Sequence, residues 1–149
     1  MSVSKVVETA LQQATVDLNA LALQGKQAHW NIVGTGFRSL HLLLDELVDF
    51  SRTSYDEFAE RLVAIGGNPD ARANTIANTA SLSPIDPGPI GVDKAYAHME
   101  EAVLRVAEVM KSHIDAVDAE DHLSADLLIS TARELEKTAW MLRAERPVV

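Results

Sequence analysis

The sequence predicts an all-α protein in which four long helices form a bundle. Apolar residues recur three and four residues apart through four segments, which is the period of an amphipathic helix. Four of the five prolines fall between residues 68 and 91, where they prevent a long helix. Short polar or glycine-containing stretches separate the other segments. The four helices are therefore joined by a short turn, a long crossover and a second short turn.

The first predicted helix covers residues 3–32 and ends at a tight turn that Gly34 and Gly36 allow. The second covers residues 37–65 and ends at Gly66 and Gly67, in the manner of a glycine stop. The apolar faces of these two helices are Val7, Ala10, Leu11, Ala14, Leu18, Leu21, Ala22 and Ala28, and Leu40, Leu43, Leu44, Leu47, Val48, Phe58, Leu62 and Ile65.

The connection between the second and third helices covers residues 68–91. A structureless stretch of this length is unusual inside a compact domain, so we expect a short helix at residues 75–80. Asp93 is the expected N-cap of the third helix, which extends to Val117. The fourth helix covers residues 123–143, with Pro147 just beyond its end. No strand competes with these helices, and we expect one domain over residues 1–149.

The composition narrows the possible function classes. The 13 Lys and Arg against 22 Asp and Glu give a formal charge of −9, which argues against nucleic-acid binding by the whole surface. No apolar run reaches the roughly 18–20 residues of a membrane span, and no secretion signal is apparent, so we expect a cytoplasmic protein with no membrane partner. The chain has no cysteine, so any metal must bind His, Asp or Glu.

Five polar residues of the first two helices are candidate metal ligands. His29 and His41 lie six residues before and after Thr35 at the centre of the turn, so an antiparallel hairpin brings both imidazoles to the same level. On the second helix His41, Asp45, Asp56 and Glu60 fall at roughly 0°, 40°, 60° and 100°, at about 100° per residue. These four residues therefore share one narrow face of the second helix.

One ion cannot touch this whole face, because the 15 residues from His41 to Asp56 span about 22 Å. If two chains pack this helix antiparallel about a two-fold axis, His41 and Asp45 of one chain face Asp56 and Glu60 of the other. Such nitrogen and carboxylate donors suit Fe(II) or Zn(II) better than calcium. A solvated acidic face with a histidine at a helix end is the alternative reading.

The chain resembles the Dps family (DNA-binding protein from starved cells) of mini-ferritins, most closely its actinobacterial members. The resemblance covers almost the whole chain. It rests on Leu23-Gln24-Gly25-Lys26-Gln27-Ala28-His29-Trp30-Asn31, on Gly34, Phe37, Leu40-His41, Asp45-Glu46, Asp56 and Ala59-Glu60-Arg61, and on Ala116-Val117-Asp118-Ala119-Glu120-Asp121, Ser124-Ala125-Asp126-Leu127-Leu128, Leu135-Glu136-Lys137 and Trp140.

The resemblance implies a ferritin-like four-helix subunit with a short helix in the long connector. Twelve such subunits, arranged as two-fold dimers, would form a hollow shell that stores iron. It also implies ferroxidase sites between two subunits, where Fe(II) is oxidised preferentially by hydrogen peroxide. The family's ligand positions correspond here to His29, His41, Asp45, Asp56 and Glu60. Trp30 resembles the family's tryptophan beside the site, a possible electron donor, although a packed amphipathic anchor is the alternative.

The resemblance implies an acidic pore for iron uptake, with Asp126 and then Asp121 as its residues. Ordinary solvated loop charge is the alternative for these carboxylates. His98, His113 and His122 are expected at the surface or at a pore rim, and Tyr55, Met99 and Met110 in packing roles.

Two other functions stay open. One is a DNA-protecting protein of the nucleoid; only Lys5 is basic near the start and the final residues 143–149 include Glu145, so we expect weak or absent direct DNA binding. The other is a zinc-loaded shell or a metal-dependent hydrolase on the same scaffold, because His and carboxylate ligands also suit zinc, which would substitute for iron or inhibit.

Overall fold

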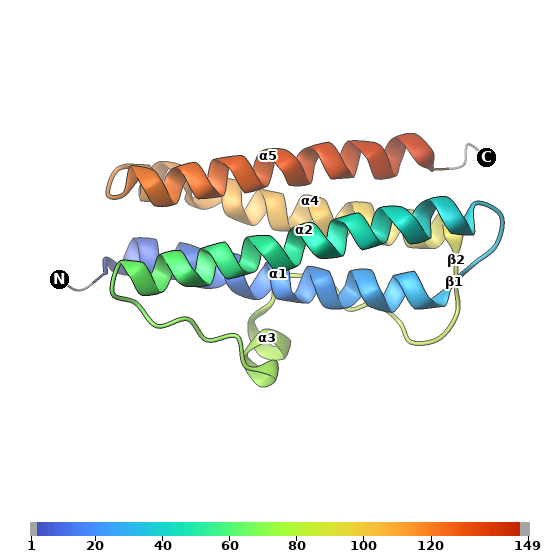
Figure 1. Ribbon diagram of the computed structural model, residues 1–149, viewed down its shortest axis with the longest axis horizontal. Helices are drawn as coiled ribbons and strands as arrows, with labels where there is room; N and C mark the ends of the chain where they lie inside the picture. The colour runs from blue at the N-terminus through green and yellow to red at the C-terminus, as the bar shows by residue number, and fades with distance from the viewer. Residues whose placement is uncertain (1–2, 147–149) are drawn as a thin grey trace.

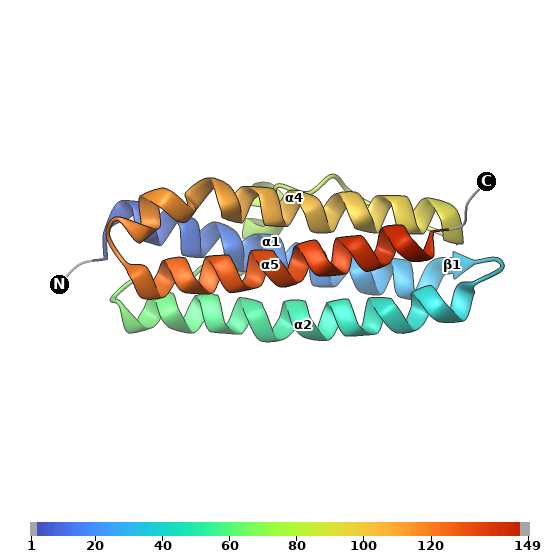
Figure 2. The ribbon, with the colours of Figure 1, turned by 90° about the horizontal axis from the view of Figure 1, so that it is seen from above.

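Two antiparallel helical hairpins lie side by side in the computed structural model, which describes residues 3–146 (Figure 1). The elements are α1 (Lys5–Asn31), β1 (Ile32–Val33), α2 (Phe37–Ala64), α3 (Ala73–Thr79), β2 (Ile90–Gly91), α4 (Val92–Asp118) and α5 (His122–Glu145). Figure 2 shows the four long helices running the length of the molecule, and Figure 1 shows the connection from α2 to α4 crossing from one end to the other by way of α3. The predicted all-α bundle and its short connector helix are confirmed.

Helix boundaries follow local capping. The Ser4 hydroxyl accepts a hydrogen bond from Val7 N (3.2 Å), so α1 begins two residues later than predicted. The prediction that Asp93 caps the third helix is wrong: Gly91 is the N-cap of α4, and Asp93 lies in its first turn. There its carboxylate faces the positive end of the helix dipole, so an acidic residue is favourable without being the cap.

A short parallel pairing that periodicity did not predict joins the ends of the two hairpins. Ile32 pairs with Ile90 and Val33 with Gly91. Gly34 and Gly36 then turn the chain into α2, with φ of 121° and 84°, a region that side chains with a Cβ rarely adopt. The expectation that no strand forms is therefore wrong, because two residues are too few to show an alternating pattern.

The apolar faces of the four long helices meet in one core. Gly25 allows α1 to approach α2 closely, because a Cβ there would lie 2.8 Å from a methyl carbon of Val48. The largest side chains shielded completely or almost completely from solvent are Phe58, Leu11, Leu18, Leu21, Leu40, Leu44, Leu62, Met99, Met110, Leu128, Leu135 and Leu142. The packing roles predicted for Met99 and Met110 are confirmed, and Tyr55 packs half-buried against the same core.

A buried carboxylate fastens the long connection to α1. Asp17 is 1% exposed and accepts hydrogen bonds from Ser81 N (2.7 Å), Ser81 Oγ (2.6 Å) and Gln13 Nε2 (3.0 Å). These bonds satisfy a charge that would be costly to bury alone. Ile76 of α3 is also buried, so the connector helix lies against α1 rather than projecting into solvent.

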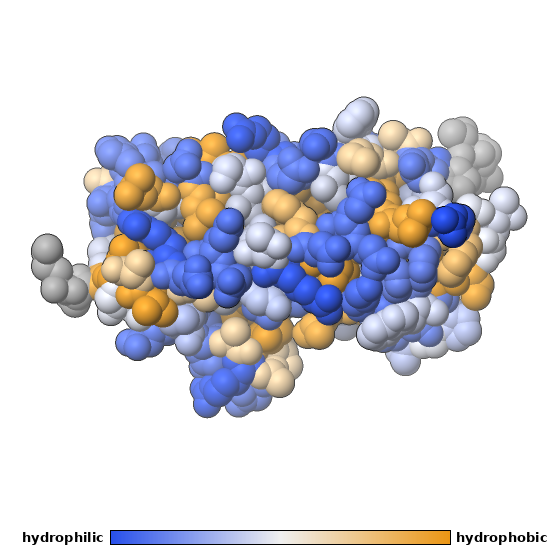
Figure 3. All heavy atoms as spheres, viewed as in Figure 1, coloured by the Kyte–Doolittle hydropathy of each residue, from blue (hydrophilic) through white to orange (hydrophobic). Residues whose placement is uncertain are grey.

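The outer surface is mixed in character. Figure 3 shows hydrophobic side chains in patches among hydrophilic ones on the face that α2 crosses. Exposed large apolar residues on α1 and α2 include Leu23, Trp30, Phe37 and Leu42. Among the residues described, no helix is both long enough and apolar enough to cross a membrane.

Candidate metal centre

The end of α1 and the start of α2 bring His29 and His41 into face-to-face contact. Their ring centroids lie 3.6 Å apart, with 17° between the ring planes. His29 is buried, His41 is half-buried, and Phe37 stacks on His41 with the ring centroids 4.9 Å apart. The predicted juxtaposition of the two imidazoles across the turn is confirmed.

Each histidine is held by the backbone of the other. His29 Nδ1 donates to the carbonyl of His41 (2.9 Å), and His41 Nδ1 donates to the carbonyl of His29 (3.0 Å). A carbonyl oxygen can only accept, so both Nδ1 atoms carry the proton. In the neutral form of imidazole this arrangement leaves the lone pair on Nε2, which is the tautomer that binds a metal.

Asp45 completes a cluster with the two histidines. One nitrogen of each ring and one Asp45 carboxylate oxygen lie within 4.8 Å of one another, and this is the one group of three or more potential metal ligands within residues 3–146. Asp45 lies one helical turn beyond His41, so α2 presents both side chains on the same face. Nitrogen and carboxylate donors together suit Fe(II) or Zn(II).

Lys26 is a neighbour of this cluster to which the sequence pattern assigned no role. The side chain of Lys26 is only 22% exposed, and its ammonium forms an ion pair with Asp45 Oδ1. The hydrogen bond from Lys26 lowers the pKa of Asp45 and outweighs desolvation, which acts in the opposite direction. Lys26 precedes His29 by three residues on α1, a spacing that places both on one helical face and so offered a signal.

Asp56 and Glu60 do not reach the histidines of their own chain. Both are exposed on α2. Eleven residues separate Asp45 from Asp56, which is about 16 Å along the helix axis. The separation expected from helix geometry therefore holds, and both carboxylates are free to meet another molecule.

The other residues singled out from the sequence lie outside the cluster. Trp30 follows His29 but is 70% exposed. Asp126 is exposed on α5, whereas the carboxylate of Asp121 already has hydrogen-bond partners within the chain. The Asp121 carboxylate caps α5 and binds Arg61 Nη2 through both oxygens, at 3.0 and 2.8 Å. Burial would raise the pKa of Asp121, but the hydrogen bonds from Ser124 and Arg61 outweigh it and lower this pKa to about 2.

The remaining histidines have different surroundings. His98 Nε2 donates to Gln24 Oε1 (2.7 Å), which anchors α4 to α1. The exposed His122 donates to Asp118 Oδ1 (2.6 Å), and this hydrogen bond raises the pKa of His122. His113 is half-buried on α4. The surface position expected for these residues holds most clearly for His122.

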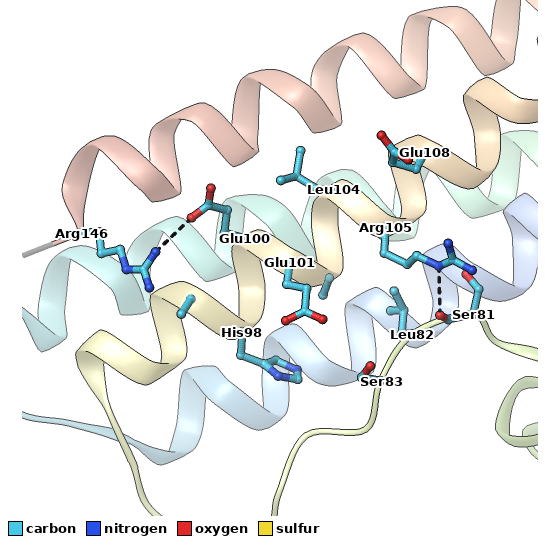
Figure 4. Close-up of a pocket in the computed structure, with 12 residues that line it drawn as sticks. Ser81, Leu82, Ser83, His98, Glu100, Glu101, Leu104, Arg105, Glu108 and Arg146 are labelled. Carbon is cyan, nitrogen blue, oxygen red and sulfur yellow. Dashed lines mark hydrogen bonds and ion pairs between the residues drawn. The ribbon is translucent and has the colours of Figure 1, made fainter.

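A groove of about 780 Å³ lies between α4 and residues 81–83 of the long connection (Figure 4). One of its carboxylates, Glu100, is paired with Arg146 at 3.6 Å, and Arg105 donates to the backbone carbonyl of Ser81. No metal-ligand cluster of residues 3–146 falls in this groove. The histidine pair is therefore the stronger candidate for metal chemistry.

Known proteins are similar to this chain in both sequence and fold. Residues 8–146 match the family of the ferritin-like domain, named Ferritin. The fine tangled pili major subunit of Haemophilus ducreyi is 35% identical, over 93% of this chain and 74% of that protein. DNA protection during starvation protein 2 of Bacillus anthracis is 33% identical, over 95% of this chain and 97% of that protein.

Solved structures agree with the sequence comparison. Dps92 from Deinococcus radiodurans superimposes with a TM-score of 0.92 at 32% identity, over 94% of this chain and 85% of that one. Dps from Microbacterium arborescens in the high iron form gives a TM-score of 0.88 at 30% identity, over 97% of both chains. With a family match over almost the whole described chain and a full-length relative at this identity, the chain belongs to the Dps family of ferritin-like proteins.

Proposed function

We propose that this protein is a ferroxidase and iron-storage subunit. It oxidises Fe(II), preferentially with hydrogen peroxide, at dinuclear sites shared by two chains, and it stores Fe(III) inside a hollow dodecamer. The observation that carries the proposal is the pair His29 and His41, each fixed by the backbone carbonyl of the other, with Asp45 beside them. The high iron form of the Microbacterium arborescens relative supports iron as the metal.

The donor set suits the oxidation. Neutral imidazoles hold Fe(II) without adding charge, whereas the negative charge of Asp45 favours Fe(III). Hydrogen peroxide accepts two electrons, and two irons at one site supply both of them. The peroxide is then reduced to water, and little hydroxyl radical escapes.

A second chain supplies the missing carboxylates. Two α2 helices packed antiparallel bring the exposed Asp56 and Glu60 of one chain to the histidines of its partner. Exposed Trp30 and Leu42 near the histidines offer the apolar surface that such a contact buries. Each dimer then contains two equivalent sites.

Acidic groups at the turn between α4 and α5 attract the iron. Asp126 is exposed there, and we assign it to the uptake pore. Asp121 belongs to the same region, but its carboxylate is committed to Arg61, so it shapes the pore rather than binding ions.

The test follows iron and peroxide together. Fe(II) is added anaerobically to the metal-free assembled protein, hydrogen peroxide is injected, and the ferric absorbance and the peroxide consumed are recorded. Fast oxidation at about two irons per peroxide is expected from paired metals and a two-electron oxidant. Oxidation no faster than a protein-free control would refute the proposal. Metal analysis after purification without chelators would then decide whether zinc occupies the site.

A second candidate function is DNA protection, which the name of the Bacillus anthracis relative favours. The charge of −9 opposes it, because DNA binding depends on Lys and Arg that displace counterions. We therefore propose weak or absent direct DNA binding.

A further inference from the structure

Asp49 and Arg52 lie at the middle of the α2 face that carries the candidate metal ligands. With His41 at 0° and about 100° per residue, Asp49 falls at about 80° and Arg52 at about 20°. Both side chains are exposed. Neither of them takes part in an ion pair among residues 3–146. Both charges are therefore available to another molecule.

The two residues are symmetric about the same point as the candidate ligands. The antiparallel packing of the proposed sites opposes His41 to Glu60 and Asp45 to Asp56, so its two-fold axis passes midway between residues 50 and 51. Asp49 and Arg52 lie on either side of this point, each about 2 Å from it along the helix. Asp49 of one chain is therefore level with Arg52 of the other, and the symmetry repeats the pair.

We propose that these two reciprocal ion pairs, Asp49 of each chain with Arg52 of its partner, set the register in which two copies of α2 pack and thereby align the shared metal sites. The surface takes a second copy of this chain. This inference rests on the proposed function, because the dimer is the one that the proposed sites require. Asp49 and Arg52 act as positioning residues and touch no metal.

The charges on this part of α2 explain why such a pair is needed. Arg52 is the only Lys or Arg among residues 41–60, which contain six Asp and Glu. Two such helices repel one another before any metal arrives. An ion pair at the axis offsets part of this repulsion and leaves the carboxylates at the two ends for the metal.

Other registers lose the pair. If one helix slides by four residues in one direction, Asp49 lies opposite Asp56, and Asp45 lies opposite Glu60. Like charges placed directly opposite one another disfavour that arrangement. If it slides by four residues in the other direction, Arg52 meets Asp45, which Lys26 already pairs, and Asp49 has no cation opposite.

Apolar contact beside the charges supplies affinity rather than register. Leu42, which is 44% exposed, lies opposite the half-buried Ala59 in the same packing. Burial of apolar surface is not directional, so it tolerates a small slide of one helix along the other. Opposite charges at fixed levels do not tolerate it, and they therefore select one register.

Charge reversal on separate chains tests this inference. Asp49→Arg places four cations around the axis and Arg52→Asp places four carboxylates there, so each variant alone should self-associate through α2 more weakly by about tenfold or more. In an equimolar mixture, each cation of the first variant faces a carboxylate of the second. The mixture should therefore recover both the dimers and the rate of iron oxidation.

Two further variants control for folding and for net charge. The chain that carries Asp49→Arg and Arg52→Asp together keeps opposite charges across the axis and should associate like wild type. Glu101→Arg reverses an exposed and unpaired charge on α4, on the other side of the bundle from α2 (Figure 2), and should change nothing. Sedimentation velocity over a range of protein concentrations measures association, and circular dichroism measures helix content.

The outcomes separate this inference from the proposed function. Single variants that associate and oxidise iron like wild type would overturn the inference alone. A mixture no better than either variant, from chains of normal helix content, would overturn it too. Charge-dependent pairing as expected, in a wild type that oxidises iron no faster than a protein-free control, would support the α2 register and refute the proposed function.

Discussion

His29 and His41 each donate a ring N–H to the backbone carbonyl of the other, at 2.9 and 3.0 Å, although twelve residues separate them. This reciprocal pair ties the end of α1 to the start of α2. It also fixes both rings in one orientation through hydrogen bonds to backbone carbonyls. The free nitrogens are therefore arranged before any metal arrives, so binding requires little reorganisation.

Removing the side chain of either His41 or Asp45 should abolish rapid iron oxidation. His41→Ala deletes an imidazole and Asp45→Ala deletes the clustered carboxylate, and each change removes little apolar surface, so the subunits should still assemble. Initial rates of ferric absorbance, with size-exclusion chromatography for assembly, measure this. His98→Ala is the matched control, because that histidine is also on a long helix but bonds Gln24 instead. Normal rates in both ligand variants would disprove the assignment.

Mixed subunits should reveal that each site uses two chains. In a dimer of His41→Ala with Glu60→Ala, one site carries both defects and the other carries none. Reassembly of the two variants should therefore recover part of the wild-type oxidation rate. Verified mixed dimers without any recovery would argue against sites between subunits.

The control for this experiment combines two defects on the same side of the site. A mixture of His41→Ala with Asp45→Ala leaves one damaged residue in every shared site. Such a mixture should recover no activity, although its dimers form equally well. Recovery here would mean that the two α2 ligands act in different sites.

Lys26→Met should tighten metal binding. The ammonium of Lys26 pairs with Asp45, so an incoming cation must displace it. A hydrogen bond between charged groups contributes about 1.5–3 kcal/mol, which predicts an increase in Zn(II) affinity of about tenfold or more. Isothermal titration calorimetry measures it, with Lys111→Met, which breaks an exposed pair with Glu136, as the control. Unchanged or weaker binding would show that Lys26 supports the site rather than competing for it.

The helical part of this fold could be predicted because it depends on local spacing. A short symmetric hairpin predicted that His29 and His41 lie at the same level, and in the structure their rings are in contact. The pairing of Ile32 with Ile90 could not be predicted, because 58 residues separate them and two residues show no period. The position of a short strand depends on how the hairpins pack.

The partners in ion pairs could not be predicted from spacing either. The presence of Lys26 was visible, but spacing does not say which carboxylate its ammonium reaches from another helix. Asp121 was assigned to a pore from its sequence neighbours, whereas in the structure Arg61, sixty residues away, binds its carboxylate. Such partners are fixed by tertiary packing.

The turn between α4 and α5 should loosen in acid. Asp121 has a pKa of about 2 in the folded chain, below its ordinary value of 3.8. A lowered carboxyl pKa stabilises the fold above the ordinary value, and this stability is lost as pH falls from about 4 towards 2. Asp121→Asn should lower the free energy of unfolding by about 1–3 kcal/mol at neutral pH and flatten this pH dependence. Denaturant unfolding at several pH values checks both effects. An equally steep acid dependence in the variant would assign the effect to another carboxylate.

Direct DNA binding should be weak at moderate salt. Arg143 and Arg146, near the end of α5, both contact Glu100, at 3.1 and 3.6 Å, so their charge is partly neutralised. Lys5 near the start pairs likewise with Glu8. In the proposed dodecamer, twelve chains at −9 give a formal charge of about −108, which repels phosphate. A gel shift with the purified assembly, without added metal, measures this. Glu100→Gln frees both arginines and should increase DNA retention, whereas retention by wild type would overturn the prediction.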